Sequence, residues 1–199
     1  MARPLTQRLA FVSLVAAMFL SAPPVQAKDA DANLDNSIFA AGVVPANKGE
    51  TLYTQFSLFY EGKAHLTTNY RRGILVPVNT EVTFVKASSG EIHVKLPDGV
   101  VLRLENVRKY SGENIVGIFN RTLGKAKVNL DKFPPKERQY ILEGHVETGM
   151  SKDAVIRAIG YPPKHQTPSL EISQWRYWRS RYATFIVHFK DGNVSSIKK

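Results

Sequence analysis

The sequence predicts an α+β protein, in which a small antiparallel β-barrel precedes a domain of two helices and a three-stranded antiparallel sheet. Residues 51–107 contain short runs of alternating apolar and polar residues that are bounded by Gly, Asp and Pro, as in β-hairpins. Two helical segments follow residues 134–135, and three more strand-like runs end the chain. The chain has no cysteine, so ordinary hydrophobic cores must hold these parts together.

The first 27 residues have the pattern of a cleavable export signal. Arg3 and Arg8 precede an apolar stretch over residues 9–22. This stretch is shorter than the roughly 20 residues that a helix needs to cross a bilayer, and residues 23–27 supply a proline break and a small-residue cleavage site. The alternative is an uncleaved anchor or a buried helix. We expect a periplasmic protein that does not span the membrane after cleavage and, having no cysteine to carry lipid, is not a lipoprotein.

Residues 28–50 and 51–107 differ in texture. The first segment is rich in Ala, Asp, Asn and Gly and is predicted to be a flexible leader. The second alternates strand-like runs with turn signals at residues 88–90 and 97–99, which suggests a small antiparallel barrel of about five strands. The expected strands lie near residues 53–60, 75–76, 81–85, 92–96 and 100–104.

Residues 108–133 are mixed and basic, and they are interpreted as a connector with at most one strand at 125–130. The final domain is expected over 134–199. Its first helix ends near Gly144, and its second begins after Ser151, a favourable N-cap, and stops at Gly160 and Pro162. Strands are expected at 171–178, at 182–189 and from residue 193.

Two parts of the chain resemble known families. The segment from Tyr70 to Val82 resembles the bacterial SH3-like barrel, which implies an SH3-like fold over 51–107 and binding of wall peptides or proteins. Residues 144–162, with Gly149-Met150-Ser151 opening a helix, resemble the first half of the SmpA/OmlA (BamE-like) signature. Trp175-Arg176-Tyr177 and residues 187–194 match its second half. Typical members are lipoproteins, whereas this chain has no cysteine.

The SmpA/OmlA resemblance implies a small accessory part of an envelope machine, such as outer-membrane assembly, that binds proteins and in some cases anionic lipid. Most residues of the SmpA/OmlA motif are expected to have structural roles. Gly149 permits a tight turn into the helix, and Met150 fills the space between helix and sheet. Trp175 and Tyr177 share a strand face and are expected in the core. The motif residues are Gly149, Met150, Gly160, Pro162, Trp175 and Tyr177.

The candidate binding surface follows the last of these aromatic residues. Strand alternation places Arg176 and Trp178 on the face opposite Trp175, with Arg179 and Arg181 at the next turn. A tryptophan beside arginines suits a protein-interface hot spot or an anionic headgroup site. The alternative is that Trp178 packs against the other domain.

Composition also bounds the function. The chain carries a net charge of +10, which outside the cytoplasm favours anionic lipid, lipopolysaccharide, wall polymers or acidic proteins over nucleic acid. Its five histidines are scattered, and no nucleophile, P-loop or dinucleotide motif occurs. We therefore expect no catalysis, metal or cofactor. The leading hypothesis is a periplasmic envelope protein that binds or scaffolds unidentified protein partners. The alternative is a cell-wall, lipopolysaccharide or anionic-lipid binding protein that uses the barrel and the basic surface.

Overall fold

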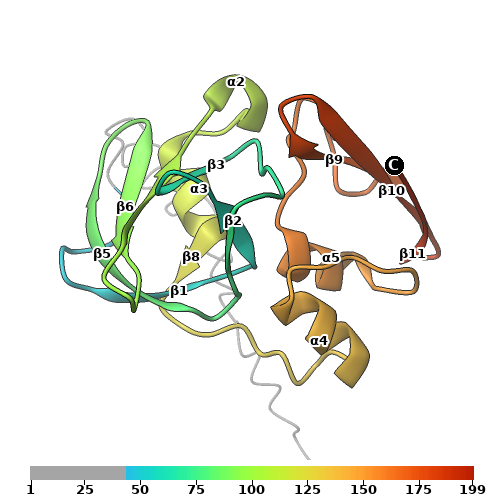
Figure 1. Cartoon of the computed structure of the whole chain (residues 1–199), viewed down its shortest axis with the longest axis horizontal. Helices are drawn as coiled ribbons and strands as arrows, with labels where there is room; N and C mark the ends of the chain where they lie inside the picture. Colours follow the sequence, from blue (N-terminus) through green and yellow to red (C-terminus); the bar gives the residue numbers. More distant parts are fainter. Residues whose placement is uncertain (1–43) are drawn as a thin grey trace, which may run out of the picture.

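The computed structural model describes residues 44–199 and confirms the α+β class. The expected export signal and residues 28–43 of the expected leader lie outside the described residues. Residues 44–124 form a first half around a curled sheet, and residues 134–199 form a second half around a three-stranded sheet (Figure 1).

The first half is built on a six-stranded sheet in the order β3-β7-β6-β5-β1-β8 (Figure 1). All neighbours are antiparallel except β3 and β7, which run parallel, so the expected purely antiparallel barrel is wrong at this edge. A two-stranded sheet, β2 and β4, adjoins it. The strands are β1 (Thr51–Thr54), β2 (Leu58–Tyr60), β3 (Ala64–Leu66), β4 (Ile74–Val76), β5 (Glu81–Ala87), β6 (Glu91–Lys95), β7 (Val101–Glu105) and β8 (Leu123–Gly124).

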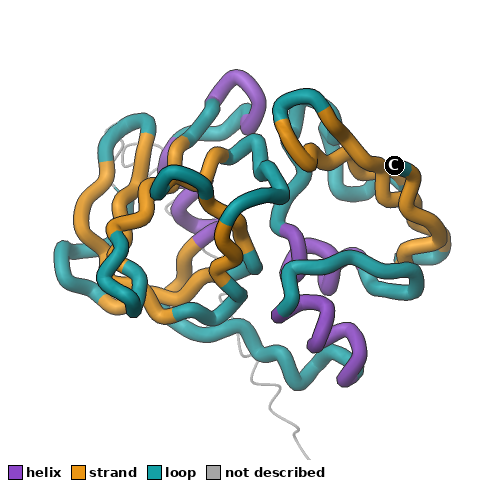
Figure 2. The backbone as a smooth tube through the Cα atoms, viewed as in Figure 1, coloured by secondary structure: helices purple, strands orange, loops and turns teal. Residues whose placement is uncertain are grey.

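The segment interpreted as a connector contains two helices, α2 (Arg108–Ser111) and α3 (Ile115–Thr122), and no strand at 125–130. Helix α3 lies inside the curve of the sheet (Figure 2) and buries Ile115, Ile118 and Phe119 in its core. Its start follows ordinary capping chemistry, because the Asn114 side chain accepts a hydrogen bond from the amide of Gly117 at 2.9 Å. A glycine within an eight-residue helix weakens the helical pattern, which explains the wrong prediction.

The described end of the expected leader is also ordered by packing. Val44 is buried in the first core, and the amide of Gly49 donates to the carbonyl of Phe84 at 2.8 Å. Residues 44–50 therefore belong to the first half, and the prediction of a flexible leader is wrong for them. The apolar signal in this segment is one valine and one alanine among Pro, Gly and polar residues, which is too little to predict a packed segment.

The second half contains helices α4 (Pro135–Leu142) and α5 (Lys152–Ile159) and a sheet in the order β11-β10-β9. Its strands are β9 (Gln174–Ser180), β10 (Ala183–Lys190) and β11 (Asn193–Lys198). The three-stranded antiparallel sheet is confirmed. The Ser151 hydroxyl caps α5 by accepting from the amide of Ala154 at 3.2 Å, and Gly160, with φ of +71°, ends it. Gly144 takes a left-handed φ of +63° just after α4, as expected of a C′ residue.

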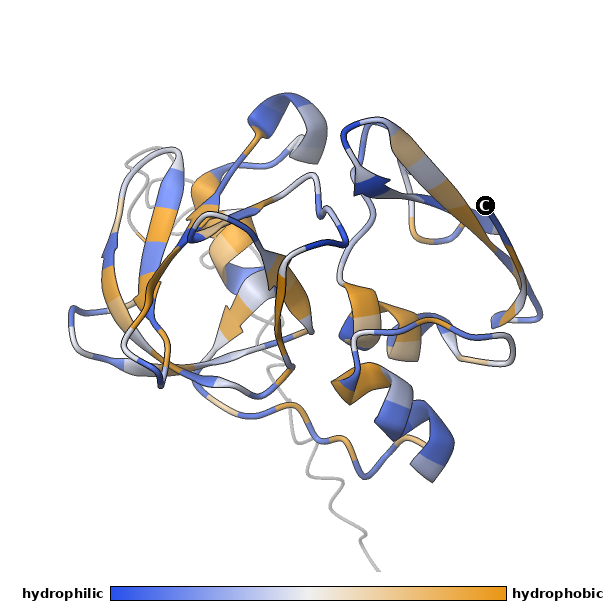
Figure 3. Ribbon diagram, viewed as in Figure 1, coloured by the Kyte–Doolittle hydropathy of each residue, from blue (hydrophilic) through white to orange (hydrophobic). Residues whose placement is uncertain are grey.

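Each half has its own hydrophobic core, and Figure 3 shows where hydrophobic residues occur along the elements of both halves. The second core contains Met150, Trp175 and Tyr177, each no more than 1% exposed, so these residues pack as their spacing predicts. Pro162 is also buried, and Gly149 turns with a left-handed φ of +93°. Tyr161 contacts both cores and thus lies at the junction of the two halves.

Buried hydrogen bonds join the halves at α5 and the end of α4. The backbone amide of Ser57 donates to the carbonyl of Arg157 at 2.9 Å, and the Ser57 hydroxyl donates to the carbonyl of Ile141 at 2.7 Å. In return, Nη1 of Arg157 donates to the carbonyl of Gln55 at 2.9 Å. Buried polar groups need such partners, so these bonds fix how the halves meet.

Candidate binding sites at the junction of the two halves

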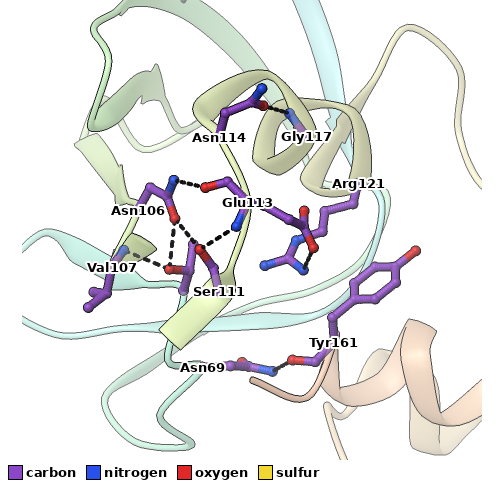
Figure 4. Close-up of polar contacts among 10 residues, drawn as sticks. Asn69, Asn106, Val107, Ser111, Glu113, Asn114, Gly117, Arg121 and Tyr161 are labelled. Carbon is purple, nitrogen blue, oxygen red and sulfur yellow. Dashed lines mark hydrogen bonds and ion pairs between the residues drawn. The ribbon is translucent and has the colours of Figure 1, made fainter. Parts of the chain in front are cut away.

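The loop at residues 67–73 between β3 and β4, which we call the bridging loop, connects the halves. Asn69 adopts a left-handed φ of +57°, which asparagine tolerates better than most residues. Its Nδ2 donates to the carbonyls of Ile159 at 2.6 Å and Tyr161 at 3.1 Å (Figure 4 shows the second bond). This side chain therefore fixes the bridging loop against the end of α5.

The bridging loop next meets strand β9. The amide of Arg71 donates to the carbonyl of Trp178 at 3.3 Å. Tyr70 and Trp178 line one hollow, whereas Arg71 and Arg179 line another. Neighbouring side chains on each segment thus enter different hollows, and this single backbone contact lies in the wall between them.

The first hollow, which we call the aromatic cleft, has a volume of about 340 Å³. Its rings are closely arranged: those of Tyr110 and His165 have centroids 4.7 Å apart, and that of Trp178 lies 6.3 Å from His165 at an angle of 22°. Tyr182 stands at the rim and is 88% exposed. The cleft is lined by Thr68, Tyr70, Tyr110, His165, Gln166, Trp178, Arg181 and Tyr182.

A polar network fixes the side of the cleft that carries Tyr110 (Figure 4). Oδ1 of Asn106 accepts from the Ser111 hydroxyl at 2.7 Å, and its Nδ2 donates to the carbonyl of Glu113 at 2.9 Å. The amide of His165 donates to the carbonyl of Tyr110 at 3.3 Å. Helix α2 is therefore tied both to its own half and to the other, although it has only four residues.

Two residues of the cleft contain buried donors without a hydrogen-bond partner among the described residues, Thr68 at Oγ1 and Trp178 at Nε1. A buried donor left unsatisfied costs about 1–3 kcal/mol. A ligand that accepted a hydrogen bond from either group would recover part of this cost. The aromatic cleft thus combines ring surfaces with unused donors.

The second hollow, which we call the arginine cavity, has a volume of about 380 Å³. The Arg71 guanidinium donates from Nη2 to the carbonyl of Gly144 and lies 4.5 Å above the ring of Phe59. Its Nη1 is buried without a partner among the described residues. Burial lowers the pKa of Arg71 to about 10, so the group stays charged at neutral pH. The lining consists of Phe59, Arg71, Gly144, His145, Val146, Glu147, Ile159, Arg179, Phe185, Ile197 and Lys199.

One acidic side chain, Glu147, occurs in this lining, and it already has a partner. Its Oε1 lies 2.8 Å from Nε2 of His145, and this hydrogen bond lowers the pKa of Glu147. The Arg179 guanidinium lies 5.6 Å from the ring of Phe185. The cavity therefore has apolar walls and positive charge that its own carboxylate does not neutralise.

The structure divides the four predicted surface residues. Trp178 and Arg181 line the aromatic cleft, and Arg179 lines the arginine cavity. Arg176 lines neither: its backbone amide donates to the Thr167 hydroxyl at 3.0 Å, and it pairs across the sheet with Ile186. Trp178 is half-buried at the junction of the halves. It contacts the other half and also lines a hollow, so it has features of both alternatives considered from the sequence, a binding surface and packing against the other domain.

Sequence reasoning missed the residues that the first half contributes. Tyr70 and Arg71 belong to the segment that resembles the SH3-like barrel, but that resemblance marks neither as a residue of these hollows, and Tyr110 lies in no motif. Their partners in the second half lie roughly 55 to 110 positions further along the chain. His165 lies in a polar loop where nothing in the sequence separates it from other histidines. No periodicity could have brought these residues together.

Within residues 44–199, no helix is long and apolar enough to cross a membrane. In the same range, no three His, Asp or Glu side chains lie close enough together to hold a metal ion. Comparison with known proteins adds no identity: no family model matches the chain, and neither the curated proteins nor the solved structures yield a match.

Proposed function

We propose that this chain is a non-catalytic, periplasmic envelope protein that holds a segment of a partner protein in the aromatic cleft. The observation that carries this proposal is the convergence of rings from both halves, those of Tyr70, Tyr110, His165 and Trp178, on one hollow with Arg181 at its edge. Aromatic and arginine side chains dominate the binding energy of protein interfaces.

Charge narrows the kind of segment that would fit. The described lining of the cleft contains no acidic residue, and Arg181 belongs to it. The Nζ atom of Lys109 lies 5.5 Å from the ring of Tyr110, which adds a second cation beside the cleft. An acidic segment that carries an apolar or aromatic anchor would therefore be complementary.

The setting rests on sequence patterns. The export signal at residues 1–27 supports a periplasmic location, and the SmpA/OmlA resemblance of residues 144–194 supports a role in an envelope machine such as outer-membrane assembly. The net charge of +10 favours the alternative, in which the basic surface binds a wall polymer, lipopolysaccharide or anionic lipid.

Photo-crosslinking in intact cells tests the proposal. A benzoylphenylalanine in place of the exposed Tyr182 should crosslink to a protein, and Trp178→Ala in the same chain should abolish that crosslink by removing an anchor ring. The same probe in place of Ile74, which is 60% exposed on the first half, is the matched control.

The alternative gives a different result. Crosslinks from position 182 only to lipopolysaccharide, or none, would contradict the proposal if the purified protein also sedimented with sacculi or anionic liposomes. Binding driven by the net charge should weaken steeply as salt rises from about 0.05 to 0.5 M, because screening shortens the reach of surface charges.

A further inference from the structure

The charge of Arg71 has no counterion in the described part of the chain. No carboxylate oxygen lies within 4.0 Å of its guanidinium there, whereas the neighbouring Arg72 pairs with Glu61, Nε to Oε2, at 2.7 Å. Burying a charge without a partner is costly, because the interior cannot replace its hydration. An anion from outside would offset that cost.

The phenol of Tyr177, which interacts electrostatically with Arg71, cannot serve as that anion. Burial raises the pKa of Tyr177 well above its usual value, so its phenol remains neutral, and its hydroxyl donates to the carbonyl of Gly160 at 3.0 Å. Glu147 at the cavity is hydrogen-bonded to His145 instead. Neither group therefore neutralises the charge of Arg71.

The guanidinium is also held in place before any ligand arrives. Its bond to the carbonyl of Gly144 and its contact with the Phe59 ring, 4.5 Å from the ring centre, restrict its position. Gly144 allows this approach, because a Cβ atom there would lie 3.3 Å from Nη2 of Arg71 and 2.8 Å from Leu75. A pre-organised arginine loses little entropy on binding, and its planar fork matches a carboxylate.

The rest of the cavity indicates what the anion is attached to. Phe59, Val146, Ile159 and Phe185 give it apolar walls, and its volume of about 380 Å³ is at the small end of ligand sites, which span about 300–1,000 Å³. One buried cation, Arg71, balances one negative charge, and the other two cationic side chains of the lining, Arg179 and Lys199, are exposed. A monoanion with an apolar body fits better than a dianion.

We propose that the arginine cavity binds a small organic carboxylate, with its head on Arg71 and its apolar body between Phe59 and Phe185. This site is separate from the aromatic cleft, so the inference does not depend on the proposed function. The junction of the halves would then bind a small ligand in the arginine cavity and a protein partner in the aromatic cleft.

Calorimetric titration of the purified protein with octanoate tests the inference, with octan-1-ol as the uncharged analogue of the same chain length. Octanoate should bind at least tenfold more tightly than the alcohol, because only the carboxylate forms hydrogen bonds with the guanidinium in which both partners are charged. Arg71→Gln should weaken octanoate binding about 10- to 100-fold, whereas Arg72→Gln should leave it unchanged.

A second variant tests the same site without changing Arg71, in case Arg71→Gln disturbs the junction of the halves. Ile197 lies half-buried on the cavity wall near the end of β11, so Ile197→Trp should fill the space and abolish octanoate binding while Arg71 remains. Equal affinity for octanoate and octan-1-ol, or unchanged binding in a folded Arg71→Gln protein, would overturn the inference.

Other anions complete the design. Hexyl phosphate and inorganic phosphate should bind more weakly than octanoate, and tighter binding of either would show a phosphate site and overturn the carboxylate assignment. Vesicles of phosphatidylglycerol should compete with octanoate no better than vesicles of phosphatidylcholine. Binding of the protein to the anionic vesicles alone, with no binding of free octanoate, would likewise overturn it.

Discussion

The aromatic cleft and the arginine cavity lie on either side of one contact, yet they are built on opposite principles. The cleft gathers aromatic rings and unused donors, whereas the cavity surrounds a single buried cation with apolar walls. Both arise because Arg71 and Trp178 meet through their backbones, which sends adjacent side chains in different directions. One junction can therefore provide two chemically distinct sites, and each can be altered without the other.

Gly160→Ala should disturb both hollows and cause the greatest loss in the free energy of unfolding among these predictions. Gly160 has φ of +71° and ψ of −168°, which only glycine adopts readily, and a Cβ atom there would lie 2.6 Å from Phe56. Gly160→Ala should lower the free energy of unfolding by about 4 kcal/mol, from strain and overpacking together. Urea denaturation measures this loss.

Gly149→Ala is the matched control for that substitution. Gly149 also has a left-handed φ, +93°, but no atom lies within 4 Å of its would-be Cβ. This variant should lose only about 1 kcal/mol, the cost of the backbone conformation alone. Similar losses in the two variants would mean that packing at Phe56 contributes nothing to the junction.

Acid should destabilise the protein through His65, which contacts a residue of the arginine cavity. His65 is buried, and its Nδ1 lies 2.8 Å from the carbonyl of Phe59, a cavity residue. Burial lowers the pKa of His65 to about 4, and the nearby cations Arg71 and Arg121 oppose its protonation too. In the unfolded chain its pKa returns to about 6.5.

The direction in which stability changes with pH follows from proton binding by the folded and unfolded states. Between pH 6.5 and about 4, the unfolded state binds the proton that the folded state refuses, so stability falls as the pH falls. The full loss is about 3 kcal/mol by pH 4, and His65→Gln should remove this part of the pH dependence. Urea denaturation between pH 7 and 4 measures it, and a flat profile in the unsubstituted protein would contradict the burial of neutral His65.

An effect of about 1–2 kcal/mol should be confined to the aromatic cleft. Asn106 joins Ser111 and Glu113 around helix α2, so Asn106→Ala removes these bonds and frees the segment that carries Tyr110. Hydrogen exchange at the amide of Gly112, which bonds to the carbonyl of Arg108, should become faster. Octanoate affinity should not change, and a parallel loss there would mean that the two hollows are coupled.

The elements predicted correctly are those whose chemistry is local. Ser151 and Gly160 bound helix α5 through contacts a few residues away, and the strands expected at 182–189 and from residue 193 pair as neighbours. Alternation within β9 predicted that Trp175 and Tyr177 are buried. Such signals are complete within one turn or one strand, so the sequence contains them whole.

The wrong or missing predictions involve long-range packing. Helix α3 is stabilised by the curled sheet around it, and strand β3 pairs with a strand almost forty residues later. The hollows depend on the bridging loop meeting β9, so only the residues contributed by β9 and the turn after it, Trp178, Arg179 and Arg181, could be suspected from sequence. Neither the SH3-like nor the SmpA/OmlA resemblance bears on that meeting, and both remain predictions.

Arg72, the neighbour of Arg71 in the bridging loop, should contribute the least to stability. Arg72 pairs with Glu61, but both side chains are more than half exposed, so water screens the pair and competes for it. Arg72→Gln should change the free energy of unfolding by less than about 0.5 kcal/mol and leave crosslinking at position 182 intact. A loss above about 1 kcal/mol in urea denaturation would show that this exposed pair supports the bridging loop. The difference between Arg71 and Arg72 could then not be explained by burial alone.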